Sequence, residues 1–189
     1  KAQFNLGLIY GEGKYIMADY NKAIYYYTLA ANQNCLNAQF NLGNIFSSDL
    51  YANKYIDKAI YYYTLAANQN DPIAQMNLGL IYFEGKYIPR DIKKSKKYFK
   101  LSGNGNCAQA YFYLYNIYIN ERYQRKSINK ANYYLSKLEK INNPNDLYGI
   151  GLAFENGFEN IPLDINKAIH FYELSARKNF VDAQYQLGI

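Results

Sequence analysis

The sequence has no tryptophan, four prolines, two cysteines and one histidine, and these scarcities limit the chemistry open to it. Ser-His-Asp and Cys-His catalysis both need a histidine as general base, and the sole candidate, His170, lies in a helical pattern. Metal sites are built from clusters of Cys, His and carboxylate side chains, and no spacing in the sequence selects one. We therefore expect no catalytic residue, no metal ligand and no cofactor, and a protein that is not an enzyme.

Long apolar runs are also missing. No stretch approaches the roughly 20 apolar residues that a membrane-spanning helix needs, so no transmembrane segment is expected in this chain. The formal net charge is +6. Such a charge could steer acidic partners or nucleic acid, but it is an ordinary excess, and no nucleic-acid partner is expected.

The most informative feature of the sequence is a block of residues that occurs twice. Residues 22–34 and 58–70 both read KAIYYYTLAANQN, at an offset of 36 residues. A fixed period of this size indicates a stack of small structural units rather than one globular core. We predict a single array over residues 1–189, with repeats at 2–37, 38–73, 74–109, 110–145 and 146–182 and a partial sixth at 183–189. The array looks like an excerpt of a longer protein.

Each repeat contains two helical patterns, with small or apolar residues at i, i+4, i+7 and i+8. In repeat one they are Ala2, Leu6, Ile9 and Tyr10, then Ala23, Tyr27, Ala30 and Ala31. Glycine recurs inside the first helix, where it costs roughly 1 kcal/mol relative to alanine. These glycines, at 7, 43, 79 and 151, predict a close helix crossing, for which Ala23, Ala59 and Ala168 would supply the small partner.

Stop and start signals separate the two helices. Glycines at 13, 85 and 157 lie where a left-handed C-terminal cap belongs. Good N-cap residues precede the second helix in four repeats: Asp19, Asp91, Ser127 and Asp164.

The two cysteines, Cys35 and Cys107, are 72 residues apart, which is two periods. Because each repeat advances by about 10 Å, the two sulfurs would be on the order of 20 Å apart. A disulfide needs Cα atoms within about 7 Å, so we predict free thiols. Free thiols weakly favour a reducing compartment, and the localisation is otherwise open.

The residue spacing within each repeat resembles a known pattern. The spacing A-x-x-x-L-G-x-x-Y-x-x-G, followed by D-x-x-K-A, is matched by Ala2, Leu6, Gly7, Tyr10, Gly13, Asp19, Lys22 and Ala23. It is similar to the Sel1-like repeat family, a relative of the tetratricopeptide repeats. The resemblance implies an all-α fold, an α/α solenoid of about five antiparallel helix pairs in a right-handed superhelix. It also implies a scaffold or adaptor that binds a protein or peptide on its concave surface.

Two repeats depart from the pattern. In repeat two, Asp49 replaces the loop glycine and Tyr55 replaces the N-cap aspartate. In repeat four, Tyr115 replaces the mid-helix glycine and cannot allow the same backbone approach. Either drift compensated locally, or a bend or binding site, would explain repeat four.

The candidate partner-binding residues flank the packed stripe of the first helices, which the resemblance places on the concave side. They are Gln3, Asn5, Gln39, Asn41, Gln75, Asn77, Tyr111 and Tyr113. Amides both donate and accept hydrogen bonds, so a ladder of them could hold an extended peptide. The structural alternative is that they only solubilise the groove or bond neighbouring helices.

Lysines also cluster in the second helix of repeat three, at positions 93, 94, 96, 97 and 100. This cluster is interpreted as a solvated face, with an acidic protein, a lipid or nucleic acid as alternative contacts.

Two other functional hypotheses stay open. The array could be the accessory arm of a larger enzyme or of a membrane-associated complex. Some cysteine-rich secreted relatives are associated with β-lactam binding or hydrolysis, but their paired cysteines are missing here. The identity of the partner and the oligomeric state are not predicted.

Overall fold

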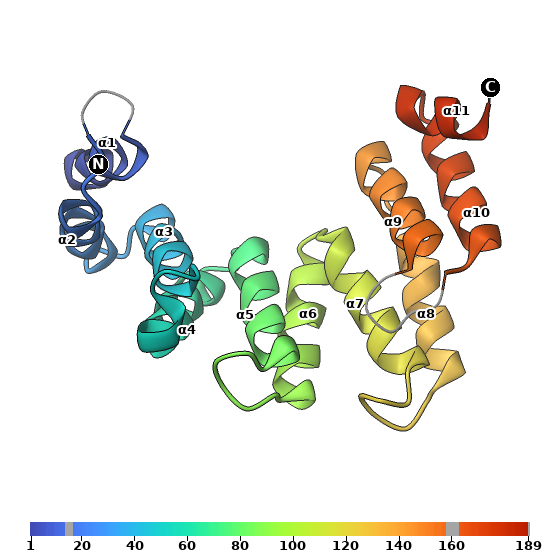
Figure 1. Ribbon diagram of the computed structural model, residues 1–189, viewed down its shortest axis with the longest axis horizontal. Coiled ribbons are helices and arrows are strands. Elements are labelled where there is room, and N and C mark those ends of the chain that lie inside the picture. The colour runs from blue at the N-terminus through green and yellow to red at the C-terminus, as the bar shows by residue number, and fades with distance from the viewer. Residues whose placement is uncertain (14–16, 158–162, 189) are drawn as a thin grey trace. The chain divides into compact units, whose positions relative to one another are not determined.

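The computed structural model describes residues 1–13, 17–157 and 163–188, and every regular element among them is a helix (Figure 1). The chain divides into an N-terminal unit, Lys1–Gly105, and a C-terminal unit, Asn106–Ile189. The N-terminal unit contains α1 (Ala2–Glu12), α2 (Tyr20–Ala31), α3 (Leu36–Ser47), α4 (Ala52–Asn68), α5 (Pro72–Glu84) and α6 (Ile92–Asn104). The C-terminal unit contains α7 (Ala108–Ile119), α8 (Ile128–Leu138), α9 (Pro144–Asn156), α10 (Ile165–Ala176) and α11 (Val181–Leu187). The all-α expectation is confirmed.

Helices pack as successive pairs, α1 with α2, α3 with α4, α5 with α6, α7 with α8 and α9 with α10. Between pairs, α2 packs on α3, α4 on α5 and α10 on α11, whereas α9 packs on α7. The core of the N-terminal unit is therefore a line of small and aromatic side chains, including Ala23, Leu42 and Tyr63. This is the helix-pair solenoid that the sequence period predicts.

The expected N-caps are confirmed for the three aspartates. Asp19, Asp91 and Asp164 each accept a hydrogen bond from the backbone N–H three residues later, at 2.9–3.0 Å. Ser127 also occupies the N-cap position, as expected, although its side chain makes no capping hydrogen bond. In all four repeats the backbone N–H of the N-cap residue donates to a carbonyl near the end of the preceding helix, at 2.8–2.9 Å. The loop is therefore closed even where the side-chain cap is lost.

The C-terminal glycine caps are confirmed at two of three positions. Gly13 and Gly85 are left-handed, each with φ 65°. Gly157 has φ 73° but ψ 156°, an extended conformation that only glycine adopts readily. Asparagine takes the left-handed role at the junctions between repeats, where Asn34, Asn70, Asn106 and Asn179 have φ of 60–66°. Asparagine is among the few residues that tolerate this region.

Repeat two lacks the usual loop. Its second helix, α4, begins at Ala52, ahead of the expected start, and the backbone is non-helical at Tyr55 (φ −130°, ψ 18°). Tyr55 thus marks the position where the other repeats begin their second helix. Asp49, which replaces the loop glycine, accepts hydrogen bonds from Lys86 Nζ (2.8 Å) and Tyr87 Oη (3.0 Å) of the next repeat.

The mid-helix glycines do mark a close crossing, but the expected partner was wrong. A Cβ added at Gly43 would overlap the ring of Tyr63 and lie 2.5 Å from its Cε1, whereas Ala59 is not among the nearest atoms. An aromatic ring is likewise nearest to the other three glycines, which face Tyr27, Phe99 and Tyr172. At Gly151 the carbonyl of Ala168, the expected partner, also lies 3.3 Å from an added Cβ. The glycine makes room for an aromatic ring that lies across the helix, because removing the Cβ removes the overlap.

In repeat four, the two positions of this crossing hold other residue types. Tyr115 stands where the other repeats have glycine, and Leu135 stands where they have the aromatic ring. Tyr115 is only 5% exposed. Its ring contacts Phe154 of α9, with centroids 5.7 Å apart and an interplanar angle of 74°. The larger side chain of repeat four is therefore buried against the following repeat.

Ser95 gives a test of polar burial in this core. It is fully buried, its Oγ has no hydrogen-bond partner among the described residues, and the equivalent position is alanine in the other four repeats. We expect Ser95→Ala to stabilise the protein by about 1 kcal/mol, since an unsatisfied hydroxyl is removed and helix propensity rises. Ser102→Ala, on the same helix, is the matched control. It should destabilise by about 1 kcal/mol, because Ser102 Oγ donates to the Pro72 carbonyl at 2.7 Å. Urea unfolding followed by circular dichroism measures both, and a loss of stability in Ser95→Ala would contradict the expectation.

The sequence also predicts free thiols and no membrane-spanning segment. Cys35 and Cys107 are free and half-buried, as predicted. Among the described residues, no helix has both the length and the apolar character to cross a bilayer.

Candidate functional site

The candidate residues lie on the first helix of four successive repeats. Gln3 and Asn5 are on α1, Gln39 and Asn41 on α3, Gln75 and Asn77 on α5, and Tyr111 and Tyr113 on α7. The six amides belong to the N-terminal unit and the two tyrosines to the C-terminal unit. The structure brings the amides together in one array, and the tyrosines are described separately below.

The glutamines form hydrogen bonds between one repeat and the next. Gln39 is 2% exposed and Gln75 is 4% exposed. Each donates its Nε2 to a backbone carbonyl in the last turn of the preceding helix, Gln39 to Ala31 (3.3 Å) and Gln75 to Ala67 (3.2 Å). Carbonyls in that turn have no partner within their own helix, so the glutamine satisfies one of them.

The third glutamine, Gln3, is half-buried and accepts a bond from Gln33 Nε2 at 2.7 Å. Gln39 accepts the equivalent bond from Gln69 Nε2, also at 2.7 Å. For these three glutamines the contacts are the ones that the structural alternative describes. Exposure does not separate the two residue types, since Gln3, Asn41 and Asn77 are all partly exposed.

Two of the three asparagines lie beside tyrosine side chains. Asn5 is exposed, and Asn41 and Asn77 are half-exposed. The hydroxyls of Tyr27 and Tyr63, the two rings that cross the helix glycines, lie near amides of the next repeat, with Asn41 beside Tyr27 and Asn77 beside Tyr63. We call this arrangement the Tyr–Asn ladder, made of Tyr27, Asn41, Tyr63 and Asn77.

Further polar groups surround the second step of the ladder. Tyr63 Oη donates to Asn44 Oδ1 at 2.8 Å and lies 3.0 Å from Ser47 Oγ. Burial raises the pKa of both Tyr27 and Tyr63. Nearby polar side chains offset part of that rise, Asn41 for Tyr27, and Ser47 and then Asn77 for Tyr63. Both hydroxyls therefore stay protonated at neutral pH, and each amide keeps donor and acceptor capacity for another group.

The C-terminal unit has a related arrangement that sequence reasoning missed. Tyr172 Oη donates to Glu155 Oε2 at 2.6 Å, and Gln186 Nε2 donates to Glu155 Oε1 at 3.1 Å. Burial, followed by the bond to Glu155, raises the pKa of Tyr172. The available signal was alignment, because Tyr172 matches Tyr27 and Gln186 matches the ladder asparagines once one extra residue in repeat five is allowed.

Tyr111 and Tyr113 of α7 stand where the three earlier repeats have glutamine and asparagine, so the amides do not continue into repeat four. Tyr111 is half-buried and stacks on Tyr134, with centroids 6.2 Å apart and planes at 30°. Tyr113 is half-buried as well. The preceding repeat has Phe99 in place of the ladder tyrosine. A repeat without the hydroxyl is thus followed by a repeat without the amide.

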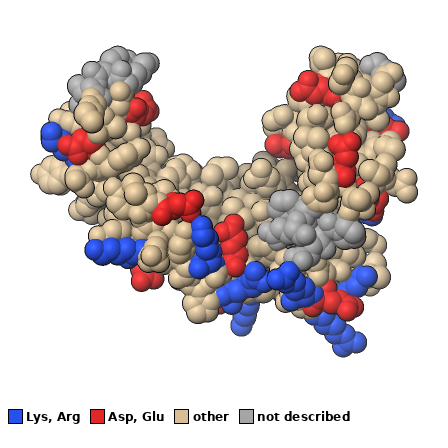
Figure 2. Space-filling view, viewed as in Figure 1, with Lys and Arg blue, Asp and Glu red and all other residues tan. Residues whose placement is uncertain are grey.

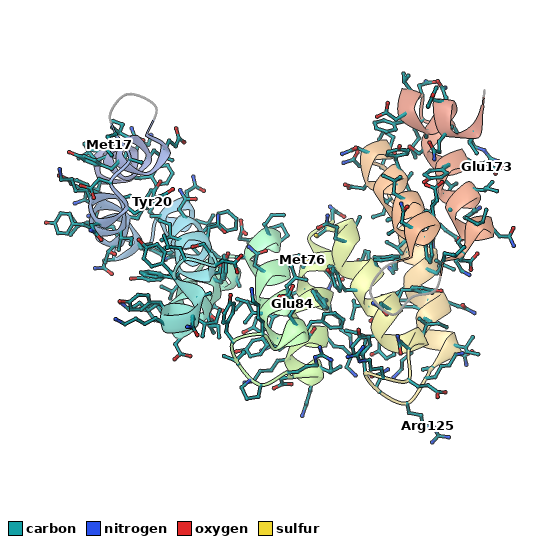
Figure 3. All side chains as sticks on the ribbon, in the orientation of Figure 1. Met17, Tyr20, Met76, Glu84, Arg125 and Glu173 are labelled. Carbon is teal, nitrogen blue, oxygen red and sulfur yellow. The ribbon has the colours of Figure 1, made fainter. Side chains whose placement is uncertain are left out.

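Groups suited to catalysis or metal binding do not converge in the described part of the chain. No cluster of three or more His, Cys, Asp or Glu side chains occurs among those residues. His170 is exposed, and its Nε2 lies 3.2 Å from Glu139 Oε1. Met17 and Tyr20, which Figure 3 labels near the start of α2, are exposed. The best-defined polar array is therefore the Tyr–Asn ladder.

Comparison with known proteins places this array in a family. The Sel1 repeat model matches residues 1–35, 36–71, 72–107 and 145–180. The unmatched stretch contains repeat four, where Tyr115 and Leu135 replace the glycine and the aromatic ring of the crossing. No curated protein is similar enough in sequence to count as a match.

Solved structures share the fold. A Sel1 repeat protein from Oxalobacter formigenes is 25% identical with a TM-score of 0.69, over 98% of this chain and 54% of that one. The chain thus spans about half the length of that relative. A putative Sel1 repeat protein from Klebsiella pneumoniae is 17% identical (TM-score 0.56, 98% and 89% covered). The immunity protein Pa5087 from Pseudomonas aeruginosa is 18% identical (TM-score 0.52, 96% and 68% covered). At these identities the last two show the fold alone.

Proposed function

Because the chain belongs to the Sel1 repeat family, whose fold typically mediates protein–protein interaction, we propose that it is a non-enzymatic scaffold for a protein or peptide partner. The partner lies along the Tyr–Asn ladder of the N-terminal unit. The observation that carries the proposal is the repeated placement of a partly exposed amide beside a buried tyrosine, Asn41 beside Tyr27 and Asn77 beside Tyr63.

The ladder suits an extended peptide backbone. An extended chain presents both N–H and C=O groups, and an asparagine side chain can donate to one and accept from the other. Neighbouring packed helices lie about 10 Å apart, and an extended chain advances about 3.3 Å per residue. Successive ladder amides would therefore contact the peptide at about every third residue. The tyrosine beside each amide limits the space open to it, which lowers the entropy lost on binding.

Two features weigh against the alternatives. The cysteines are free, so the disulfide-linked repeats of the β-lactam-associated relatives have no counterpart here. Acid–base chemistry at the ladder would need a group that changes its protonation state near neutral pH. Burial instead raises the pKa of the ladder tyrosines, which keeps them protonated. A scaffold needs neither disulfide-linked repeats nor a group that changes its protonation state near neutral pH.

The test begins with the full-length protein and identification of its partner by affinity purification and mass spectrometry. Calorimetry then measures the affinity of that partner for Asn41→Ala/Asn77→Ala. We expect binding about ten-fold weaker, because two hydrogen bonds of about 0.5–1.5 kcal/mol each are lost, while helical circular dichroism stays unchanged.

Asn32→Ala/Asn68→Ala is the matched control. Both residues are exposed and occupy the same place in the two identical sequence blocks, at the far end of the second helices. Binding should be unchanged in this variant. Equal affinity in the ladder variant, or an equal loss in the control, would overturn the proposed site.

A further inference from the structure

The second helix of repeat three differs from its equivalents in charge. α6 carries five lysines in thirteen residues and no acidic residue. The equivalent helices α2, α4, α8 and α10 have at most two lysines each. Lys and Arg side chains gather at the lower ends of α5 and α6 in Figure 2. The charge is therefore a local property of this repeat.

Three of these lysines form a straight, unpaired stripe. Lys93, Lys97 and Lys100 are exposed and stand at i, i+4 and i+7, one above another on the helix face. Among the described residues, none of the three has a carboxylate within ion-pair distance, whereas Lys94 pairs with Asp91 at 3.8 Å. We call Lys93, Lys97 and Lys100 the lysine stripe.

The stripe is electrostatically unfavourable in the isolated protein. Like charges three or four residues apart destabilise a helix by about 0.2–0.5 kcal/mol per pair, and the stripe contains two such pairs. Two other helices place acidic residues beside their basic ones. α4 interleaves Asp57 with its lysines, and Glu173 of α10 pairs with Arg177, the C-cap residue, at 3.6 Å. An anionic partner would relieve the repulsion on α6.

We propose that the lysine stripe is a second docking surface, which binds an acidic helical segment of a protein partner. A helix rises about 1.5 Å per residue, so the three ammonium groups follow a line of about 10 Å, and carboxylates at i, i+4 and i+7 of a partner helix have the same spacing. The lysine stripe lies on α6, which contributes no residue to the Tyr–Asn ladder. The two proposals are therefore independent.

The surroundings favour an acidic protein over nucleic acid. Bases bind proteins by stacking on free aromatic faces. The rings next to the stripe are already occupied, because Tyr82 and Tyr98 stack with centroids 5.9 Å apart and planes at 3°. Lys94 Nζ lies 4.9 Å from the Tyr82 ring centroid, and Lys97 Nζ lies 5.6 Å from that of Tyr98.

A membrane surface fits less well for a different reason. Helices that lie in the bilayer interface bury an apolar face and carry their lysines on the opposite face. The buried face of α6 is used inside the protein, where Ser95, Phe99 and Ser102 pack. Leu101, at 42% exposed, is its one exposed large apolar side chain. Little remains on this helix to enter a lipid layer.

The experiment uses a defined probe and a matched variant. The probe is an alanine-based helical peptide with glutamates at i, i+4 and i+7, compared with a peptide of the same composition whose glutamates do not share a face. Lys93→Gln/Lys97→Gln/Lys100→Gln should bind the aligned peptide about ten-fold more weakly than the unmodified protein, because three exposed ion pairs are lost. Its binding should also depend less on salt concentration.

Lys22→Gln/Lys54→Gln/Lys58→Gln is the control, since it removes the same charge from exposed lysines of α2 and α4. We expect its affinity to stay within about two-fold of the unmodified protein. Equal binding of the two peptides, or an equal loss in the control, would overturn the proposal. So would binding to phosphatidylserine vesicles or single-stranded DNA in place of the aligned peptide.

Discussion

Gly43→Leu should destabilise the N-terminal unit by about 3 kcal/mol, the upper end of the usual range for overpacking. A Cβ at this position would overlap the Tyr63 ring, with Cε1 only 2.5 Å away, and leucine adds three further carbons. Tyr63 is 2% exposed and bonds Asn44, so its ring cannot move aside without breaking that hydrogen bond. Urea unfolding followed by far-UV circular dichroism measures the loss.

Two companion variants separate overpacking from a general effect of replacing glycine in a helix. Gly149→Ala, on α9, should stabilise by up to about 1 kcal/mol, because nothing lies within 4 Å of an added Cβ there. Gly43→Leu/Tyr63→Leu should lose less stability than the two single changes together, since the smaller side chain admits the larger one. Repeat four already carries Tyr115 and Leu135 at the two equivalent positions. An unaltered stability in Gly43→Leu would show that the crossing is not tight.

Phe154→Ala should destabilise the C-terminal unit by about 3–5 kcal/mol, the cost of emptying a fully buried aromatic site. Phe154 is 0% exposed. Its ring contacts those of Phe112 (5.3 Å between centroids), Tyr115 (5.7 Å) and Phe171 (5.7 Å). These rings come from three helices, α7, α9 and α10, so one truncation loosens both the pair α9–α10 and its packing on α7.

Phe154→Leu is the matched control and should cost less than about 1.5 kcal/mol, because it keeps most of the apolar volume. Thermal unfolding by circular dichroism provides the comparison. If Phe154→Ala lost no more stability than Phe154→Leu, the aromatic cluster would not be what holds repeat four to repeat five.

The helix pairs could be predicted because their determinants are local. The period of 36, the N-cap aspartates and the left-handed glycines each specify backbone geometry within a few residues. The free state of Cys35 and Cys107 also followed from the period, since it fixes how far apart equivalent positions lie. Ser127 takes the predicted N-cap position without a side-chain capping bond, and its loop closes through the backbone.

The candidate site could be predicted only in outline. The sequence selected Gln39, Asn41 and their equivalents as polar positions beside a packed stripe. It could not separate glutamines that bond a buried carbonyl from asparagines that lie beside a tyrosine, because both face a neighbouring repeat. That distinction depends on side-chain direction and on which group of the next repeat lies within reach.

The sequence by itself determined that this protein is a stack of helix pairs and that glycine marks each tight crossing, because repetition and backbone preference act along the chain. Only the tertiary structure decided that the glycine accommodates the ring of Tyr63 rather than Ala59, and that Lys93, Lys97 and Lys100 have no described carboxylate beside them. These are contacts between helices that the chain brings together after many intervening residues. Packing, burial and charge at those contacts exist only once the repeats are stacked.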